Sequence, residues 1–103
     1  MIRCDGDVVL GRHAEVSSFV IAYGAGGLAL GDHAYVGPQC WINCDGDVRI
    51  GSESALGPRT TVFTHGSFLP VTRGYPTRVA GVSVGDRTWV AVQAFLHPGV
   101  HVG

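Results

Sequence analysis

The sequence predicts an all-β protein, a triangular solenoid of parallel strands built from hexapeptide repeats. Three observations support this prediction. An aliphatic residue followed by glycine recurs in LGRHAEV (10–16), LGDHAYV (30–36), IGSESAL (50–56) and VGDRTWV (84–90). Aliphatic residues return every twenty positions, in steps of six, six and eight. Glycine accounts for 16 of the 103 residues, as expected of a chain that turns a corner every few residues. A short fixed period of this kind is typical of coils stacked around one core.

Each coil is expected to have three faces, and each face to begin at one column of aliphatic residues. The columns are Leu10, Leu30 and Ile50; Val16, Val36 and Leu56; and Ala22, Ile42 and Val62. The longest step of each coil lies in 2–11, 22–31 and 42–51, and the first and third of these segments are close copies. Glycine, aspartate and serine are expected at the corners, where a positive φ or a side-chain-to-backbone hydrogen bond is useful.

The rhythm breaks once, between Val62 and Val84, which are 22 residues apart where eight are expected. The surplus lies in HGSFLPVTRGYPTRVAG (65–81), whose glycines and prolines predict a loop that leaves the solenoid. This loop contains Phe68 and Tyr75, which are unusual in a loop left in water, so it is expected to cover a site. The alternative is an insertion that folds onto its own coil.

Composition limits the classes of function. A chain of 103 residues predicts a single domain, 1–103. The net charge of -1 argues against a nucleic-acid partner bound through phosphates. We find no apolar run long enough for membrane insertion and no signal peptide, so a cytoplasmic location is expected. Cys4 and Cys44 lie two coils apart, about 10 Å, too far for a disulfide.

Two segments resemble a known family. VGDRTWVAVQAFLHPGVHVG (84–103) and LGPRTTVFTH (56–65) are similar to the left-handed β-helix acyltransferases of the hexapeptide-repeat superfamily, and most similar to the galactoside- and maltose-type O-acetyltransferases. The resemblance implies left-handed coils, acetyl-CoA or another acyl-CoA as co-substrate, and a homotrimer with its sites between subunits. Members of this family continue for one or two coils beyond the position of Gly103, so the chain is expected to be truncated at its C-terminal end or to be a short member.

The expected activity is transfer of an acetyl or other acyl group from acyl-CoA to a hydroxyl or amine of a sugar or similar small polar acceptor. His65 is the candidate general base, because a neutral imidazole has a pKa near 6.5. Asp45 lies one period below His65 and is expected to orient it or to contact the acceptor. Asn43 is a candidate substrate contact; the alternative is an asparagine that satisfies backbone groups at the corner. By resemblance, Trp89 lines the site and contacts both acceptor and coenzyme, and Ala91 contacts the coenzyme.

Two other classes of function stay open. A non-catalytic β-helix could serve as an assembly scaffold. A zinc protein resembling the γ-class carbonic anhydrases would use three histidines, and His97, His101 and His65 are the candidates. Because His97 and His101 are four residues apart, where that class has five, no metal is expected. Trp41 is expected to point outward, toward an interface or the loop.

Overall fold

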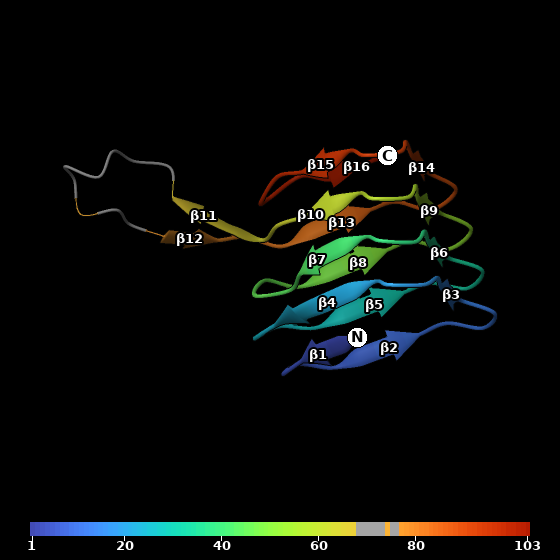
Figure 1. Ribbon diagram of the computed structural model, residues 1–103, viewed down its shortest axis with the longest axis horizontal. Helices are drawn as coiled ribbons and strands as arrows, with labels where there is room; N and C mark the ends of the chain where they lie inside the picture. Colours follow the sequence, from blue (N-terminus) through green and yellow to red (C-terminus); the bar gives the residue numbers. More distant parts are fainter. Residues whose placement is uncertain (68–73, 75–76) are drawn as a thin grey trace.

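The chain winds into a left-handed parallel β-helix whose coils stack along one axis (Figure 1). The structure is a computed structural model, and it describes residues 1–67, 74 and 77–103. In Figure 1 the N-terminal coil lies at the bottom of the stack and the C-terminal coil at the top. The predicted fold class is confirmed, since every strand pairing within the three faces is parallel.

Three sheets form the three faces of the solenoid. The first face contains β1 (Ile2–Cys4), β4 (Ile21–Gly24), β7 (Trp41–Asn43), β10 (Thr61–Val62) and β15 (Phe95–Leu96). The second face contains β2 (Val8–Leu10), β5 (Leu28–Leu30), β8 (Val48–Ile50), β13 (Val82–Val84) and β16 (His101–Val102). The third face contains β3 (Glu15–Val16), β6 (Tyr35–Val36), β9 (Ala55–Leu56) and β14 (Trp89–Val90).

The strand register reproduces the predicted columns. On the first face Ala22 pairs with Ile42, and Ile42 with Val62, each twenty residues on. The side chains of these three residues are fully buried, because successive coils place them one above another inside the triangle. After the insertion the same ladder continues from Val62 to Leu96, so the fold absorbs the surplus residues without losing register.

The two ends of the predicted ejected loop pair with each other as antiparallel strands and form a hairpin. β11 (His65–Ser67) pairs with β12 (Thr77–Val79), and the hairpin extends away from the solenoid (Figure 1). Phe68 and Tyr75, which were expected to cover a site, lie outside the described residues. None of the described residues belongs to a helix that could cross a membrane.

The recurring glycines Gly31 and Gly51 lie where adjacent coils approach closely. A Cβ added to Gly31 would lie 2.6 Å from the backbone nitrogen of Ser52, and one added to Gly51 would lie 2.5 Å from the carbonyl carbon of Gly85. Neither glycine has a positive φ. The corner residues with positive φ, between 53° and 61°, are His13, Phe19, His33, Gln39, Glu53, Arg59, Arg87 and Gln93. Glycine is therefore required because adjacent coils approach too closely for a side chain.

The predicted side-chain-to-backbone bonds are present beside these glycines. The backbone N–H of Arg12 donates to Asp32 Oδ1 at 2.7 Å, and the N–H of Ser52 donates to Asp86 Oδ1 at 2.8 Å. Each side chain thus accepts a hydrogen bond from the coil below it. These bonds join coils at a corner where the strand ladders are interrupted.

Replacing Gly51 by alanine is expected to lower the free energy of unfolding by about 1–3 kcal/mol, because the methyl group would overlap the backbone of the next coil. Chemical denaturation measures this loss. Gly85→Ala is the matched control, since a Cβ at that equivalent position meets nothing closer than 3.1 Å. Where the methyl group fits, replacing glycine by alanine stabilises the folded protein by about 0.4–1 kcal/mol, because it lowers the conformational entropy of the unfolded chain. Equal stabilities of the two variants would contradict the close-approach explanation.

Candidate active site

His65 lies where the chain leaves the solenoid, at the corner that follows the first face. Val62 is the last residue of this coil in the first-face ladder, Thr64 is still buried, and His65 begins the hairpin strand β11. The side chain of His65 is 36% exposed. The backbone N–H of Ala80 donates to the carbonyl oxygen of Thr64 at 2.8 Å, which closes the base of the hairpin. The corner thus holds the imidazole at the solenoid surface.

Asp45 lies beside His65, one coil below it. Its Oδ2 is 3.1 Å from Nδ1 of the imidazole, and its side chain is also 36% exposed. Its other oxygen, Oδ1, accepts a hydrogen bond from the backbone N–H of Ala25 at 3.1 Å. The carboxylate is therefore held from below by one coil and faces the histidine of the next.

Asn43 lies inside the solenoid, at the corner below His65. The residue is 0% exposed, and its Oδ1 accepts hydrogen bonds from the backbone N–H groups of Asp45 and Thr64 at 3.3 and 3.4 Å, so it satisfies backbone groups at the corner. Its side chain turns inward beneath Thr64, whose Oγ1 lies 2.6 Å from Asn43 Oδ1. The same Oδ1 is 3.0 Å from Nδ1 of His65. Asn43 thus contacts the candidate base from inside the solenoid.

One atom of this buried cluster has no partner. Asn43 Nδ2 makes no hydrogen bond within the part of the chain that the structure describes. An unpaired buried amide donor costs about 1–3 kcal/mol. The oxygen of the same amide, Oδ1, is in contact with both Thr64 and His65, and these contacts offset part of this cost.

Two aromatic side chains that were not predicted, Phe63 and Phe95, lie near His65. Phe63 contacts the imidazole edge-on, with ring centroids 5.6 Å apart, and Phe95 lies 6.0 Å from Phe63. Trp41 points outward as predicted and contacts Tyr23, to whose hydroxyl its Nε1 donates at 3.3 Å. The sequence could have predicted these aromatic side chains, because the residues occupy outward positions of the first-face repeat.

Trp89 and Ala91 lie far from His65 within one chain. Trp89 belongs to β14 on the third face and is 69% exposed, and Ala91 follows that strand. In Figure 1 the strand β14 and the hairpin that begins at His65 occupy opposite sides of the solenoid. A single chain therefore does not bring the predicted coenzyme contacts to the predicted base.

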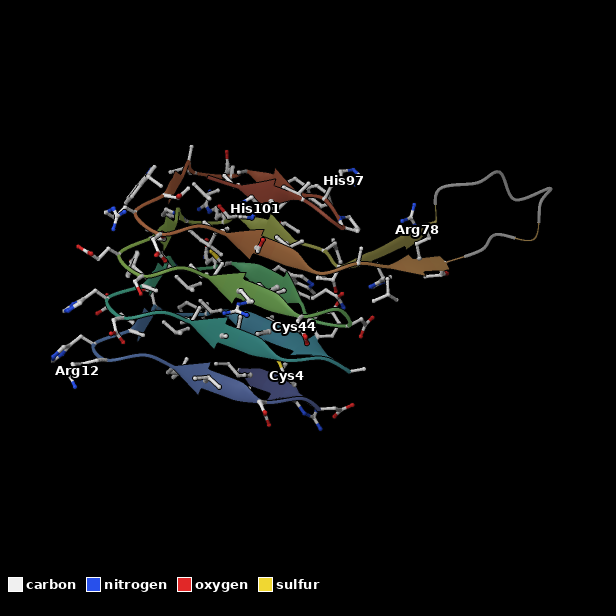
Figure 2. The ribbon with its side chains drawn as sticks, turned by 180° about the vertical axis from the view of Figure 1, so that it is seen from behind. Cys4, Arg12, Cys44, Arg78, His97 and His101 are labelled. Carbon is white, nitrogen blue, oxygen red and sulfur yellow. The ribbon has the colours of Figure 1, made fainter. Side chains whose placement is uncertain are left out.

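The remaining histidines form separate contacts. His101 Nδ1 is 2.6 Å from Ser83 Oγ on the second face, whereas His97 contacts Phe95 of the first face. Figure 2 shows His97 and His101 at different places on the last coil. Among the described residues there is no group of three or more His, Cys, Asp or Glu side chains that could hold a metal ion.

Cys44 lies between Asn43 and Asp45 in sequence, but its thiol is not suited to carry an acyl group. The residue is 0% exposed. Burial raises the pKa of the Cys44 thiol, and Cys4 and the carboxylates of Asp45 and Asp47 raise it further. Cys4 acts on Cys44 from two coils below, and Gly24, which pairs with Cys4 in the coil between them, has no side chain to separate them. Figure 2 labels the two cysteines. A nucleophilic cysteine needs an accessible thiolate, so this environment favours the inert thiol.

Comparison of the sequence with known proteins finds two similar curated proteins. No family model matches the chain. It is 29% identical over 76 residues to "Putative colanic acid biosynthesis acetyltransferase WcaF" of Escherichia coli (strain K12), and equally similar to the protein of that name in Shigella flexneri. The match covers 74% of this chain and 41% of each relative, so the chain spans less than half of their length.

A solved structure has the same fold. The chain superposes with a TM-score of 0.62 on a mutant of AntD, an N-acyltransferase from Bacillus cereus, in complex with dTDP-4-amino-4,6-dideoxyglucose and coenzyme A. The match covers 99% of this chain and 68% of AntD at 11% identity. At this identity the likeness to AntD shows the β-helix fold that the sequence predicted. The galactoside- and maltose-type branch stays a prediction.

The burial of the thiols leads to a test by alkylation with iodoacetamide, followed by mass spectrometry. Cys4, which is partly exposed, is expected to react first in the native protein. Cys40 and Cys44, both buried, are expected to react at least about 100-fold more slowly than in denaturant, because the thiolate forms only after local opening. Cys4→Ser should remove the fast reaction alone. Alkylation of all three thiols at one rate would contradict the described environment.

Proposed function

We propose that this protein transfers an acyl group, in the first instance acetyl, from acyl-CoA to a hydroxyl or amine of a sugar or similar small polar acceptor. The observation that carries the proposal is the position of His65, which is partly exposed at the corner and has Asp45 Oδ2 3.1 Å from its Nδ1. The likeness to WcaF supports acetyl transfer. The likeness to AntD, whose crystal contains coenzyme A and an amino sugar nucleotide, is consistent with the same class of chemistry.

In the proposed reaction His65 acts as general base through Nε2. The acceptor hydroxyl or amine loses a proton to Nε2 as its oxygen or nitrogen attacks the thioester carbon. The carbon–sulfur bond then breaks, and the imidazolium returns the proton to the departing thiolate of coenzyme A. Asp45 stabilises the imidazolium during this interval, since an opposite charge at hydrogen-bond distance favours the protonated ring. No protein nucleophile is needed, in agreement with the burial of Cys44.

We further propose that the complete site lies between subunits of a homotrimer. Trp89 is the predicted wall of the site, yet it lies on the third face, away from His65. A large exposed aromatic side chain on a solenoid flank is suited to contact a ligand or a neighbouring subunit. Placing the third face of one copy against the His65 corner of the next would unite the two residues. A closed ring of such head-to-tail contacts gives each copy one site.

His65→Ala is expected to lower the rate of acyl transfer by about 10²–10⁴-fold, because the reaction loses its general base. The rate is followed as coenzyme A thiol released from acetyl-CoA, with a panel of hexoses and amino sugars as acceptors. His33→Ala is the matched control, since His33 stacks on His13 at another corner, 5.2 Å between ring centroids. A His65→Ala protein that keeps the fold and loses less than about threefold in rate would exclude the proposed role.

The intersubunit site can be tested by mixing two inactive variants. His65→Ala and Trp89→Ala proteins are each expected to be nearly inactive as pure assemblies. After joint unfolding and refolding, activity should return to about a quarter of wild type, because random assembly rebuilds that share of interfaces with both residues intact. Mixing either variant with itself is the control. Absence of recovery from trimers shown by native mass spectrometry to contain both variants would refute the shared site.

A further inference from the structure

The hydrogen bonds beneath His65 determine how the Asn43 amide is turned. The backbone N–H groups of Asp45 and Thr64 point at Asn43 Oδ1, at 3.3 and 3.4 Å. An amide turned by half a rotation would aim its NH₂ group at these two donors, so the acceptor oxygen belongs in this place. Asn43 Nδ2 has no hydrogen-bond partner among the described residues, so no contact of Nδ2 favours the opposite orientation of the amide.

Thr64 holds this amide from above. Its hydroxyl is 2.6 Å from Asn43 Oδ1 and 3.1 Å from the Asn43 carbonyl oxygen, and it accepts a hydrogen bond from the N–H of Gly46 at 2.9 Å. A hydroxyl has one proton, and both nearby Asn43 atoms are acceptors, so the proton is directed to Asn43. Asn43 and Thr64 are each 0% exposed, so water does not compete for these bonds.

The position of the imidazole proton follows from these orientations. Nδ1 of His65 faces two acceptors, Asn43 Oδ1 at 3.0 Å and Asp45 Oδ2 at 3.1 Å. Only a protonated Nδ1 can donate to either of them. A neutral imidazole carries one ring proton, so Nε2 keeps its lone pair.

We propose that Asn43, held by Thr64, is a positioning residue that keeps the proton of neutral His65 on Nδ1 and the lone pair on Nε2. The use of this lone pair as a base rests on the proposed function, but the tautomer itself does not. Asp45 is 36% exposed and open to water, whereas Asn43 is buried and neutral at every pH. Asn43 therefore supplies a permanent acceptor, and Asp45 supplies the charge that stabilises the imidazolium.

The tautomer can be measured directly by long-range ¹H–¹⁵N correlation on histidine-labelled protein, at a pH where His65 is neutral. We expect a protonated Nδ1 and an unprotonated Nε2, the reverse of the form that an unconstrained neutral imidazole prefers. Asp45→Ala should keep this pattern, because Asn43 still accepts from Nδ1. Adding Asn43→Ala to Asp45→Ala should convert His65 mainly to the Nε2–H form. The proposal is overturned if wild type shows the Nε2–H form or if Asp45→Ala alone converts it.

Substitutions of Thr64 provide a second test of the proposal, which can be made even if the Asp45→Ala, Asn43→Ala double variant does not fold. In the Asp45→Ala background, Thr64→Val should raise the share of the Nε2–H form, since the isosteric side chain no longer holds the Asn43 oxygen. Thr64→Ser keeps the hydroxyl and should retain the Nδ1–H form. Identical tautomer populations in these two variants would refute the role of Thr64 in holding Asn43.

The two proposals fail separately. A Nδ1–H tautomer together with an active His65→Ala protein would refute the general base and leave the positioning intact. A Nε2–H tautomer together with an inactive His65→Ala protein would refute the positioning alone.

Discussion

The close stacking of one coil on the next is the constraint on which the rest of this structure depends. Parallel ladders on three faces place residues twenty apart directly above one another. The corners allow this only because glycine leaves room for the backbone of the next coil, as at Gly31 and Gly51. A slip of one residue would exchange inward and outward side chains along every strand. The buried columns of aliphatic residues and the glycine positions therefore specify a single register.

The candidate site lies where this stacking continues while the core becomes polar. One inward column passes from Cys4 across Gly24 to Cys44, and the next coil places Thr64 over the same corner. Thr64 brings a hydroxyl into the interior, and Asn43 turns in to meet it at 2.6 Å. Their contact supports His65 from within, while Asp45 supports it from the surface at 3.1 Å. The insertion thus starts from a rigid polar base, and the imidazole is held by the solenoid and not by the hairpin alone.

Much of this arrangement could be predicted from the repeat, and the exceptions have physical causes. The period located the insertion and brought Asp45 to His65, because both follow from counting along coils of constant length. The close approach of the coils at Gly31 and Gly51 was not predicted: these two glycines have no positive φ, and the distance between coils requires the missing side chain. The burial of the Asn43 side chain was not predicted, and its contact with a substrate stays a prediction. Asn43 ends its strand at a corner, where alternation no longer determines the direction of a side chain.

The sequence by itself determined the fold class, the three columns, the position of the ejected loop and the proximity of Asp45 to His65. These features depend on the period of the repeat, which can be read by counting residues along the sequence. Only the tertiary structure decided that Asn43 is buried under Thr64 and that Phe63 lies beside His65. These depend on how the coil closes into a triangle and on which hydrogen-bond donors compete for one buried oxygen, and neither can be counted along the chain.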